Sequence, residues 1–341
     1  MRSSLDIQSF LEKARSIPVI DVRTPKEFES GHIPGAVNLP LFSNEERAIV
    51  GTSYAQEGKE EAVLRGLDLV GARLRSLAES LRSLLPGNSA LIHCWRGGMR
   101  SGSVGWLAEF LGFEVYTLEG GYKSYRRHVL DSFEMKRNII TVGGRTGSRK
   151  TAILQELANL GEQMIDLEKL ASHRGSAFGA LGQGKQPTQE QFENDLEALL
   201  NRSDPERPLW LEDESRMIGR KEIPRGLFLQ MREARLFFLD VPRDVRVKNL
   251  VEEYGSFPIE DLCRCVENIK KRLGGLNAQN ALQALGEGDA REACKIVLDY
   301  YDRTYDYGLM SKKSDCLKVF AVSLTDPESL ALRLREAAAE P

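Results

Sequence analysis

The chain has 341 residues, enough for about two domains of ~150 residues each. Hydrophobic residues make up 41% and charged residues 28%, a mixture that excludes a disordered, collagen-like or coiled-coil chain. The formal net charge of −3 shows no strongly basic balance, although one basic face is enough to bind RNA. No apolar run approaches the ~20 residues of a membrane span, and the N-terminus lacks the apolar segment of a secretory signal. We therefore expect a cytoplasmic protein without a membrane contact.

Cysteine usage points to a reducing compartment. The cysteines are odd in number and form neither a CxxC pair nor a Cys/His cluster with zinc spacing: Cys94, Cys263, Cys265, Cys294 and Cys316. We expect their thiols to be free, and the sequence marks no certain metal site.

The first half of the chain alternates short apolar runs with amphipathic segments, as a parallel α/β domain does. Strands are predicted at 18–22, 36–39, 90–93 and 115–118. Helices are predicted from Pro25, over about 59–84, over about 100–111, and from Gly120-Gly121 to near Met135.

The pattern restarts at residue 138. Strands are predicted at 138–142, 163–167, 208–212, 235–240 and 317–323, with a helix over 151–160 directly after the first. The charged stretch 131–137 lies between the two halves. We therefore predict two α/β domains with mostly parallel sheets, at 5–134 and 138–341.

A loop after the predicted strand 90–93 carries the sharpest chemical signal. Cys94 begins it and is the candidate catalytic nucleophile, because a loop that enters a helix can aim backbone N–H groups and positive potential at one point. We expect an anion-binding loop formed by Trp95, Arg96, Gly97, Gly98, Met99 and Arg100. The adjacent His93 either serves this site or only packs beneath it.

Two families share such a loop: rhodanese-like sulfurtransferases and Cys-x5-Arg phosphatases. The stretch 93–100 satisfies the HCxxGxxR signature of the phosphatases. The upstream stretches 21–28 (DVRTPKEF) and 31–38 (GHIPGAVN) closely resemble rhodanese-like domains. The loop from Cys94 to Arg100 is one residue longer than in typical rhodaneses, so we expect room for a tetrahedral, phosphate-like group.

A second glycine loop, 143–151, follows the strand 138–142 and nearly fits the P-loop template GxxxxGK[ST]. The expected diphosphate-binding residues are Gly144, Thr146, Gly147, Ser148, Lys150 and Thr151. Arg149 stands where the template has glycine, so its side chain would either crowd bound phosphates or place a guanidinium on them.

Further residues are candidates for supporting this second loop. Asp213 follows an apolar strand, where P-loop proteins hold Mg²⁺, and His173 and Arg174 lie in a Gly/Ser-rich loop. Arg216 opens a basic stretch, 215–248, with nine Lys/Arg against four Asp/Glu, that could follow an RNA backbone. We expect the tyrosines at 300, 301, 305 and 307 to pack in a C-terminal helix rather than to stack on bases.

The two loops in this order resemble the tRNA 2-selenouridine synthase family over about residues 5–340. Further stretches carry the same resemblance: 51–54 (GTSY), 119–123 (EGGYK), 173–176 (HRGS), 186–189 (QPTQ) and 212–219 (EDESRMIG). The resemblance implies an N-terminal rhodanese-like domain followed by a P-loop NTPase-like parallel α/β domain.

The resemblance also implies a chemistry. The substrate would be 2-thiouridine at the wobble position of tRNA, whose sulfur would be prenylated by geranyl diphosphate. Selenium from selenophosphate would then displace the S-geranyl group, with Cys94 carrying selenium or otherwise assisting. Gly144, Lys150 and Thr151 would hold the diphosphate. No tightly bound cofactor is implied, and Mg²⁺ is a candidate ion.

Two other functions remain open from the residues alone. One is a Cys-x5-Arg phosphatase on a rhodanese fold, although no Asp is obviously placed as its general acid. The other is a non-catalytic regulator that binds RNA or a nucleotide.

Overall fold

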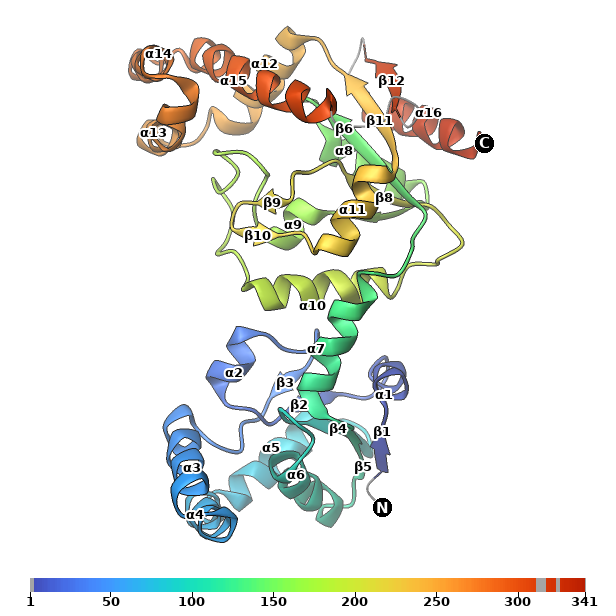
Figure 1. Ribbon diagram of the computed structural model, residues 1–341, viewed down its shortest axis with the longest axis vertical. Coiled ribbons are helices and arrows are strands. Elements are labelled where there is room, and N and C mark those ends of the chain that lie inside the picture. The colour runs from blue at the N-terminus through green and yellow to red at the C-terminus, as the bar shows by residue number, and fades with distance from the viewer. Residues whose placement is uncertain (1–2, 311–316, 323–325, 341) are drawn as a thin grey trace. The chain divides into compact units, whose positions relative to one another are not determined.

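The computed structural model describes residues 3–310, 317–322 and 326–340. The chain divides into two compact units (Figure 1). Unit 1 runs to Ser132 and includes the short segment Glu193–Asp195, and unit 2 takes the remainder. Each unit contains a five-stranded, entirely parallel sheet, which confirms the predicted fold class.

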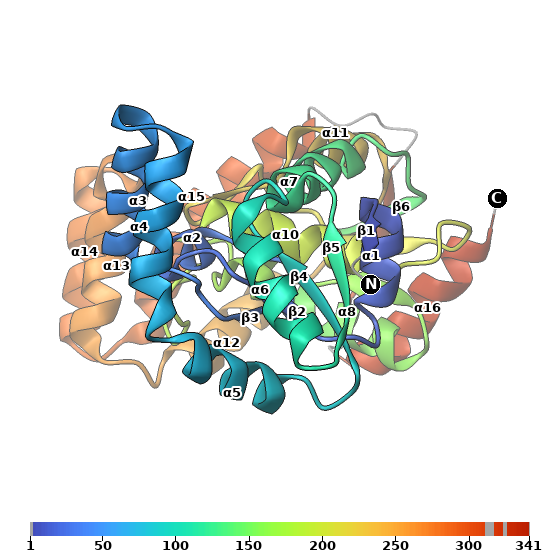
Figure 2. The same cartoon turned by 90° about the horizontal axis from the view of Figure 1, so that it is seen from below.

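The sheet of unit 1 has the strand order β1-β5-β4-β2-β3. Its strands are β1 (Ser3–Leu5), β2 (Val19–Asp21), β3 (Val37–Asn38), β4 (Ser89–His93) and β5 (Glu114–Leu118). Its helices are α1 (Ile7–Lys13), α2 (Pro25–Ser30), α3 (Asn44–Gln56), α4 (Lys59–Gly71), α5 (Leu74–Leu84), α6 (Met99–Phe110) and α7 (Gly121–Ser132). The edge strand β1, which was not predicted, pairs with β5 beside α1 (Figure 2).

Successive residues of the central strand β4 pack on opposite faces of the sheet, because successive side chains of a strand point to opposite faces. Ile92 packs into the core that α5 and α6 cover. His93 instead meets Phe10 of α1 and Tyr122 of α7. The strand is therefore buried on both faces, and its C-terminal end leads directly into the cysteine loop.

The predicted helix over 59–84 is wrong in one respect, because it is two helices, α4 and α5. The break follows Gly71, a residue of low helix propensity. Arg73 lies at the break, and its guanidinium donates to the carbonyl of Leu41 (3.1 Å) and to Glu46 (2.7 Å). These distant partners fix the bend, and periodicity within 59–84 carries no trace of them.

The sheet of unit 2 has the strand order β12-β11-β6-β8-β7, and β9 and β10 form a separate antiparallel pair. Its strands are β6 (Ile139–Gly144), β7 (Gln163–Ile165), β8 (Leu209–Glu212), β9 (Met217–Ile218), β10 (Lys221–Glu222), β11 (Arg235–Asp240) and β12 (Leu317–Ala321). Its helices are α8 (Lys150–Asn159), α9 (Leu167–Ala171), α10 (Gln189–Leu200, which includes 193–195), α11 (Arg225–Glu233), α12 (Arg243–Tyr254), α13 (Ile259–Leu273), α14 (Gly275–Gly286), α15 (Ala290–Met310) and α16 (Pro327–Ala339).

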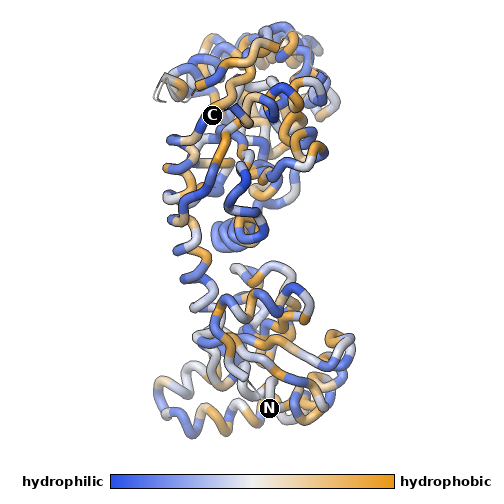
Figure 3. Tube along the Cα trace, turned by 90° about the vertical axis from the view of Figure 1, so that its right-hand side faces the viewer, coloured by the Kyte–Doolittle hydropathy of each residue, from blue (hydrophilic) through white to orange (hydrophobic). Residues whose placement is uncertain are grey.

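Two hydrophobic cores stabilise unit 2. In the first, α8 and α16 pack on the sheet around Trp210 and Phe237. In the second, α13, α14 and α15 pack against one another around residues such as Val266 and Leu285. Figure 3 shows hydrophilic and hydrophobic residues interspersed along the helices, as expected where one helix face is buried. Within the described ranges, no helix combines the length and the apolarity that a bilayer crossing requires.

Candidate functional site

Cys94 lies where β4 ends, and α6 begins five residues later. Its side chain is buried, and burial alone would raise the pKa of the thiol. The hydroxyl of Ser101, 3.2 Å from Sγ, and the backbone N–H groups of Ser101, Arg96 and Gly98 outweigh burial and lower the pKa below its ordinary value. The loop therefore favours a thiolate, the nucleophilic form of cysteine.

The loop can turn its N–H groups toward Cys94 because its carbonyl oxygens are bound elsewhere. The N–H groups of Tyr122 and Lys123, in the first turn of α7, donate to the carbonyls of Cys94 (2.8 Å) and Trp95 (3.0 Å). Gly121, with φ of +61°, allows this contact, because a Cβ there would lie 2.4 Å from the Cys94 carbonyl oxygen. The Gly120-Gly121 turn is thus part of the site's construction.

The charged residues of the loop differ in their surroundings. Arg96 is exposed. Arg100 donates through both terminal nitrogens to Glu27, at 2.6 and 3.1 Å. Burial raises the pKa of Glu27, but the hydrogen bonds from Arg100 and from Thr24 lower it more, so the pair stays charged. Arg100 keeps further N–H donors for an anion.

The remaining residues of the predicted anion-binding loop are exposed: Trp95, Gly97, Gly98 and Met99. Sequence reasoning did not single out Ser101 or Glu27 as site residues. Ser101 lies one helical turn after Gly98. A predicted helix start at the end of the loop could therefore have indicated that the Ser101 hydroxyl faces the cysteine. Glu27 lies far from the loop in sequence, so no local signal could have identified it.

Beneath the loop, buried polar residues fix its base. Asp21 and Arg23 form a fully buried ion pair (2.6 Å), and the Arg23 guanidinium lies 3.6 Å from the centre of the Tyr122 ring. Burial lowers the pKa of His93 to about 4, so its ring is neutral. Neither ring nitrogen has a hydrogen-bond partner among the described residues. His93 therefore packs beneath the loop as a neutral imidazole near neutral pH.

The other cysteines that the structure describes lack such an environment. Burial raises the pKa of Cys263, Cys265 and Cys294, in the last case to about 11. Cys316 lies outside the described residues.

The second loop connects β6 to α8 as a P-loop does. Arg149, at the template's glycine position, has φ of +58°, the left-handed conformation that glycine adopts without strain. Its guanidinium lies 2.5 Å from Glu252 of α12. An arginine in place of glycine at this position therefore strains the backbone by about 1–2 kcal/mol. The positive charge of Arg149 is neutralised by Glu252 of α12 rather than directed at the loop.

Residues of α12 hold the P-loop carbonyls from behind. Asn249 donates to the carbonyl of Gly147 (2.8 Å), and Arg246 donates to that of Thr146 (3.2 Å). Arg246 is itself fixed by two hydrogen bonds of 2.8 Å to Asp302 of α15. The hydroxyl of Ser148 is buried and has no partner among the described residues, so it remains available to a ligand.

Acidic residues gather at Lys150 and Thr151. Ligand oxygens of Glu168, Glu212 and Glu214 lie within 4.8 Å of one another, and the Thr151 hydroxyl donates to Glu212 (2.6 Å). Burial, and then the neighbouring carboxylates, raise the pKa of all three. Burial alone would lower the pKa of Lys150, but these carboxylates raise it.

This cluster fits a divalent cation. Carboxylate and hydroxyl oxygens are the hard ligands that Mg²⁺ prefers, and Oε2 of the fully buried Glu212 has no hydrogen-bond partner among the described residues. Asp213, the acid chosen from the sequence, instead accepts a hydrogen bond from Tyr305 (3.2 Å). Of the acidic run 212–214 that the sequence pointed to, Glu212 and Glu214 belong to the cluster, and nothing in the sequence marked Glu168.

Of the other proposed supporting residues, the two arginines are held by acidic partners in unit 2. Arg174 pairs with Glu253 (2.8 Å) and Arg216 pairs with Glu222. Burial lowers the pKa of His173, whose Nδ1 has no partner among the described residues.

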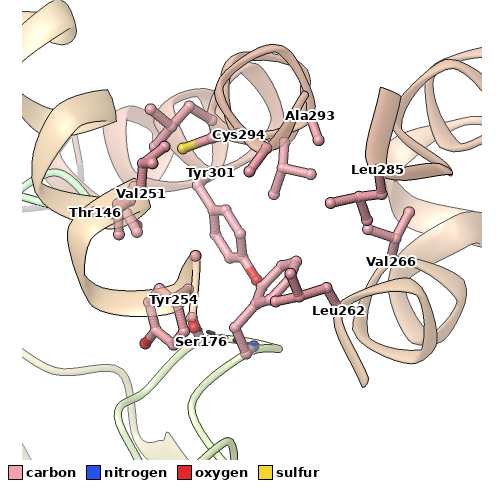
Figure 4. A pocket seen from close by; sticks show the side chains of 16 residues that line it. Thr146, Ser176, Val251, Tyr254, Leu262, Val266, Leu285, Ala293, Cys294 and Tyr301 are labelled. Atoms are coloured by element: carbon pink, nitrogen blue, oxygen red, sulfur yellow. Dashed lines mark hydrogen bonds between the residues drawn. The ribbon is translucent and has the colours of Figure 1, made fainter. Parts of the chain in front are cut away.

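An apolar pocket opens beside the P-loop (Figure 4). Thr146 of the loop lines it at one side, and Leu262, Val266 and Leu285 of α13 and α14 line it at the other. Tyr301 of α15 projects between these two sides (Figure 4). The cavity is small, about 70 Å³, so a chain of more than a few carbons enters only if the surrounding helices move apart.

Replacing Ser101 tests the thiolate. We expect Ser101→Ala to raise the pKa of Cys94, because the variant loses the hydroxyl beside Sγ and keeps the backbone N–H groups. The pH dependence of Cys94 alkylation by iodoacetamide measures this pKa. Ser103→Ala is the matched control, because its hydroxyl donates to the carbonyl of Met99. An unchanged alkylation profile in Ser101→Ala would contradict this account.

Gly121→Ala tests the packing of the two turns. Gly35→Ala is the control, because Gly35 also has positive φ (+82°) but has no atom within 4 Å of an added Cβ. We expect about 1–2 kcal/mol of destabilisation in Gly35→Ala from strain, and at least ~1 kcal/mol more in Gly121→Ala from the backbone clash. Urea unfolding measures both, and equal losses would show that the close approach does not exist.

The acidic cluster predicts a pH dependence. A carboxyl whose pKa is raised in the folded state contributes stability that is lost as pH rises above its unfolded value, near 4.5. With a chelator present to remove divalent cations, we therefore expect the free energy of unfolding to fall between pH 5 and 8. It should fall less in Glu212→Gln, because this variant has one ionisable carboxyl fewer but can still accept the hydrogen bond from Thr151. Urea unfolding midpoints measured across this pH range test the expectation. Parallel slopes in the two proteins would be inconsistent with a buried, protonated cluster.

Comparisons with known proteins cover both halves of the chain. The model of the tRNA 2-selenouridine synthase AAA domain matches residues 137–323, and that of the rhodanese-like domain matches residues 6–128. The tRNA 2-selenouridine synthase of Shewanella denitrificans is 34% identical, covering 92% of this chain and 94% of that protein. The corresponding protein of Hydrogenovibrio crunogenus is 38% identical, covering 88% and 91%.

A solved rhodanese-related protein from Thermoplasma volcanium is 21% identical over 37% of this chain and 92% of that one, with a TM-score of 0.25. The family matches confirm the predicted rhodanese-like domain and the P-loop-like domain that follows it. The chain therefore belongs to the tRNA 2-selenouridine synthase family.

Proposed function

We propose that this protein replaces the sulfur of wobble 2-thiouridine in tRNA with selenium, through an S-geranyl intermediate. The relatives named above are tRNA 2-selenouridine synthases, which supports selenouridine formation in tRNA as the activity. The geranyl donor and the selenium donor are what the family resemblance implies, and the chemistry of the two loops agrees with both.

In the first step, the sulfur of 2-thiouridine attacks C1 of geranyl diphosphate, the bond from C1 to the diphosphate oxygen breaks, and the N3 proton of the base is released to solvent. The P-loop binds the diphosphate through its backbone N–H groups and Lys150. Thr151, Glu168, Glu212 and Glu214 would hold Mg²⁺, which when bound neutralises charge on the leaving diphosphate.

One observation carries the choice of a prenyl diphosphate over a nucleotide. Thr146 belongs both to the P-loop and to the wall of the apolar pocket. A ligand whose diphosphate lies on the loop can therefore place the first carbons of a hydrocarbon tail in this pocket, and the rest of the tail enters as the surrounding helices move apart. Each buried CH₂ group contributes about 0.8 kcal/mol.

In the second step, the selenium of selenophosphate attacks C2 of the base, and geranylthiolate leaves and takes up a proton. Water then attacks phosphorus, which breaks the bond from selenium to phosphorus, releases phosphate and leaves 2-selenouridine. Cys94 either carries the selenium or orients the selenophosphate. Arg96, Arg100 and the loop N–H groups suit a tetrahedral anion beside the thiolate.

Nucleoside mass spectrometry tests this function. With geranyl diphosphate, we expect wild-type protein to add a geranyl mass to 2-thiouridine tRNA, and selenophosphate then to yield selenouridine. Lys150→Ala should lower geranylation by at least tenfold, because it loses the cation that contacts the diphosphate. Cys94→Ser should geranylate normally and fail at selenation. Lys169→Ala, an exposed lysine of α9, is the control.

Two outcomes would overturn the proposal. Unchanged tRNA, together with a phosphomonoester hydrolysed in a Cys94-dependent way, would assign the protein as a phosphatase on a rhodanese fold. Binding of tRNA that Cys94→Ser leaves intact, with no chemical change in any arm, would assign it as a non-catalytic regulator.

A further inference from the structure

Helix α15 carries tyrosines on two faces. Tyr301 accepts a hydrogen bond from the N–H of Ala177 (2.8 Å), and Tyr305 accepts one from the N–H of Gly144 (3.0 Å). These two tyrosines pack inward, as the sequence predicted. Tyr300 and Tyr307 are seven residues apart and so share a different face. Tyr307 is 82% exposed, so the expectation that all four tyrosines pack is wrong for it.

The outer face of α15 borders an open hollow of about 480 Å³. Tyr300, Arg303 and Tyr307 of α15 line one part of it, and Lys271, Arg272 and Asn277, at the turn between α13 and α14, line another. Three cations and two aromatic rings thus meet at one place, although they come from segments about thirty residues apart in the chain.

These cations are unpaired. Among the described residues, no carboxylate forms an ion pair with Lys271, Arg272 or Arg303. The basic stretch 215–248 differs, because several of its arginines pair with acids: Arg216 with Glu222, Arg243 with Asp299, and Arg246 with Asp302. The net charge of that stretch therefore overstates what it offers to RNA, whereas all three cations at the hollow lack an ion pair among the described residues.

A helix dipole accounts for only part of this arrangement. Basic residues are favourable in the last turn of a helix, which explains Lys271 and Arg272 at the end of α13. It does not explain Arg303, which lies two turns before the end of α15, or an aromatic ring left in solvent at Tyr307.

We propose that this hollow binds tRNA, with backbone phosphates against Lys271, Arg272 and Arg303 and an unpaired base stacked on Tyr307. The proposal rests on tRNA being the substrate, as argued above. Cations beside an exposed aromatic ring are the arrangement that binds single-stranded nucleic acid, because phosphates and base faces are recognised together. Tyr307 is that ring, since Tyr300 is partly buried against the core of α13–α15. An acidic protein segment would use the cations but leave Tyr307 without a role.

Fluorescence anisotropy of labelled 2-thiouridine tRNA over 50–200 mM salt tests the surface. We expect Tyr307→Ala to weaken binding at least fivefold with an unchanged salt dependence. The triple variant Lys271→Ala, Arg272→Ala, Arg303→Ala should make the slope of log K against log salt shallower by about 2, at ~0.7 per lost phosphate contact. Arg291→Ala, at the exposed start of α15, is the control and should bind as wild type does.

The outcomes separate this surface from the proposed function. Tyr307 and the cations are at the surface, and circular dichroism checks that each variant is folded. If wild-type protein binds tRNA and both variants bind it equally well with the same salt slope, the surface assignment is wrong while the function stands. If wild-type protein binds no tRNA, the proposed function itself fails.

Discussion

Both candidate sites depend on the same physical constraint. A loop can direct its backbone N–H groups at an anion only if its carbonyl oxygens are bound on the other side. At the cysteine loop, the first turn of α7 donates to the carbonyls of Cys94 and Trp95. At the P-loop, Arg246 and Asn249 of α12 donate to those of Thr146 and Gly147. In each unit, a later helix thus creates the anion site that an earlier strand and helix begin.

The balance of charge at the P-loop site links the binding of a divalent cation to the binding of a diphosphate. Three glutamates, Glu212 buried and Glu168 and Glu214 partly buried, face a single lysine. Burial, together with the charges of neighbouring carboxylates, raises their pKa values. Protons relieve the repulsion among these carboxylates in the free protein, and a divalent cation would relieve it when a diphosphate is bound. Metal and diphosphate should therefore bind with positive coupling, since each reduces the repulsion that opposes the other.

Local signals in the sequence predicted most of the framework. The two strand–loop–helix units around Cys94 and Lys150, and the parallel strands on either side, follow from apolar runs and glycine spacing. Features set by distant partners did not follow. Arg73 divides a helix by contacting Leu41 and Glu46, Glu168 reaches Thr151 from another element, and Tyr307 is exposed while Tyr305 of the same helix is buried. The sequence showed that Arg149 replaces the glycine of the P-loop template, but only the structure showed that Arg149 pairs with Glu252.

The central claim is that the P-loop serves a diphosphate with a hydrocarbon tail. Calorimetry of the full chain with Mg²⁺ can compare geranyl diphosphate, inorganic diphosphate and ATP directly. If even four carbons of the tail are buried, at about 0.8 kcal/mol each, geranyl diphosphate should bind at least 100-fold more tightly than inorganic diphosphate. A negative heat-capacity change should accompany this binding. Equal affinity for the two diphosphates, or tighter binding of ATP, would contradict the account.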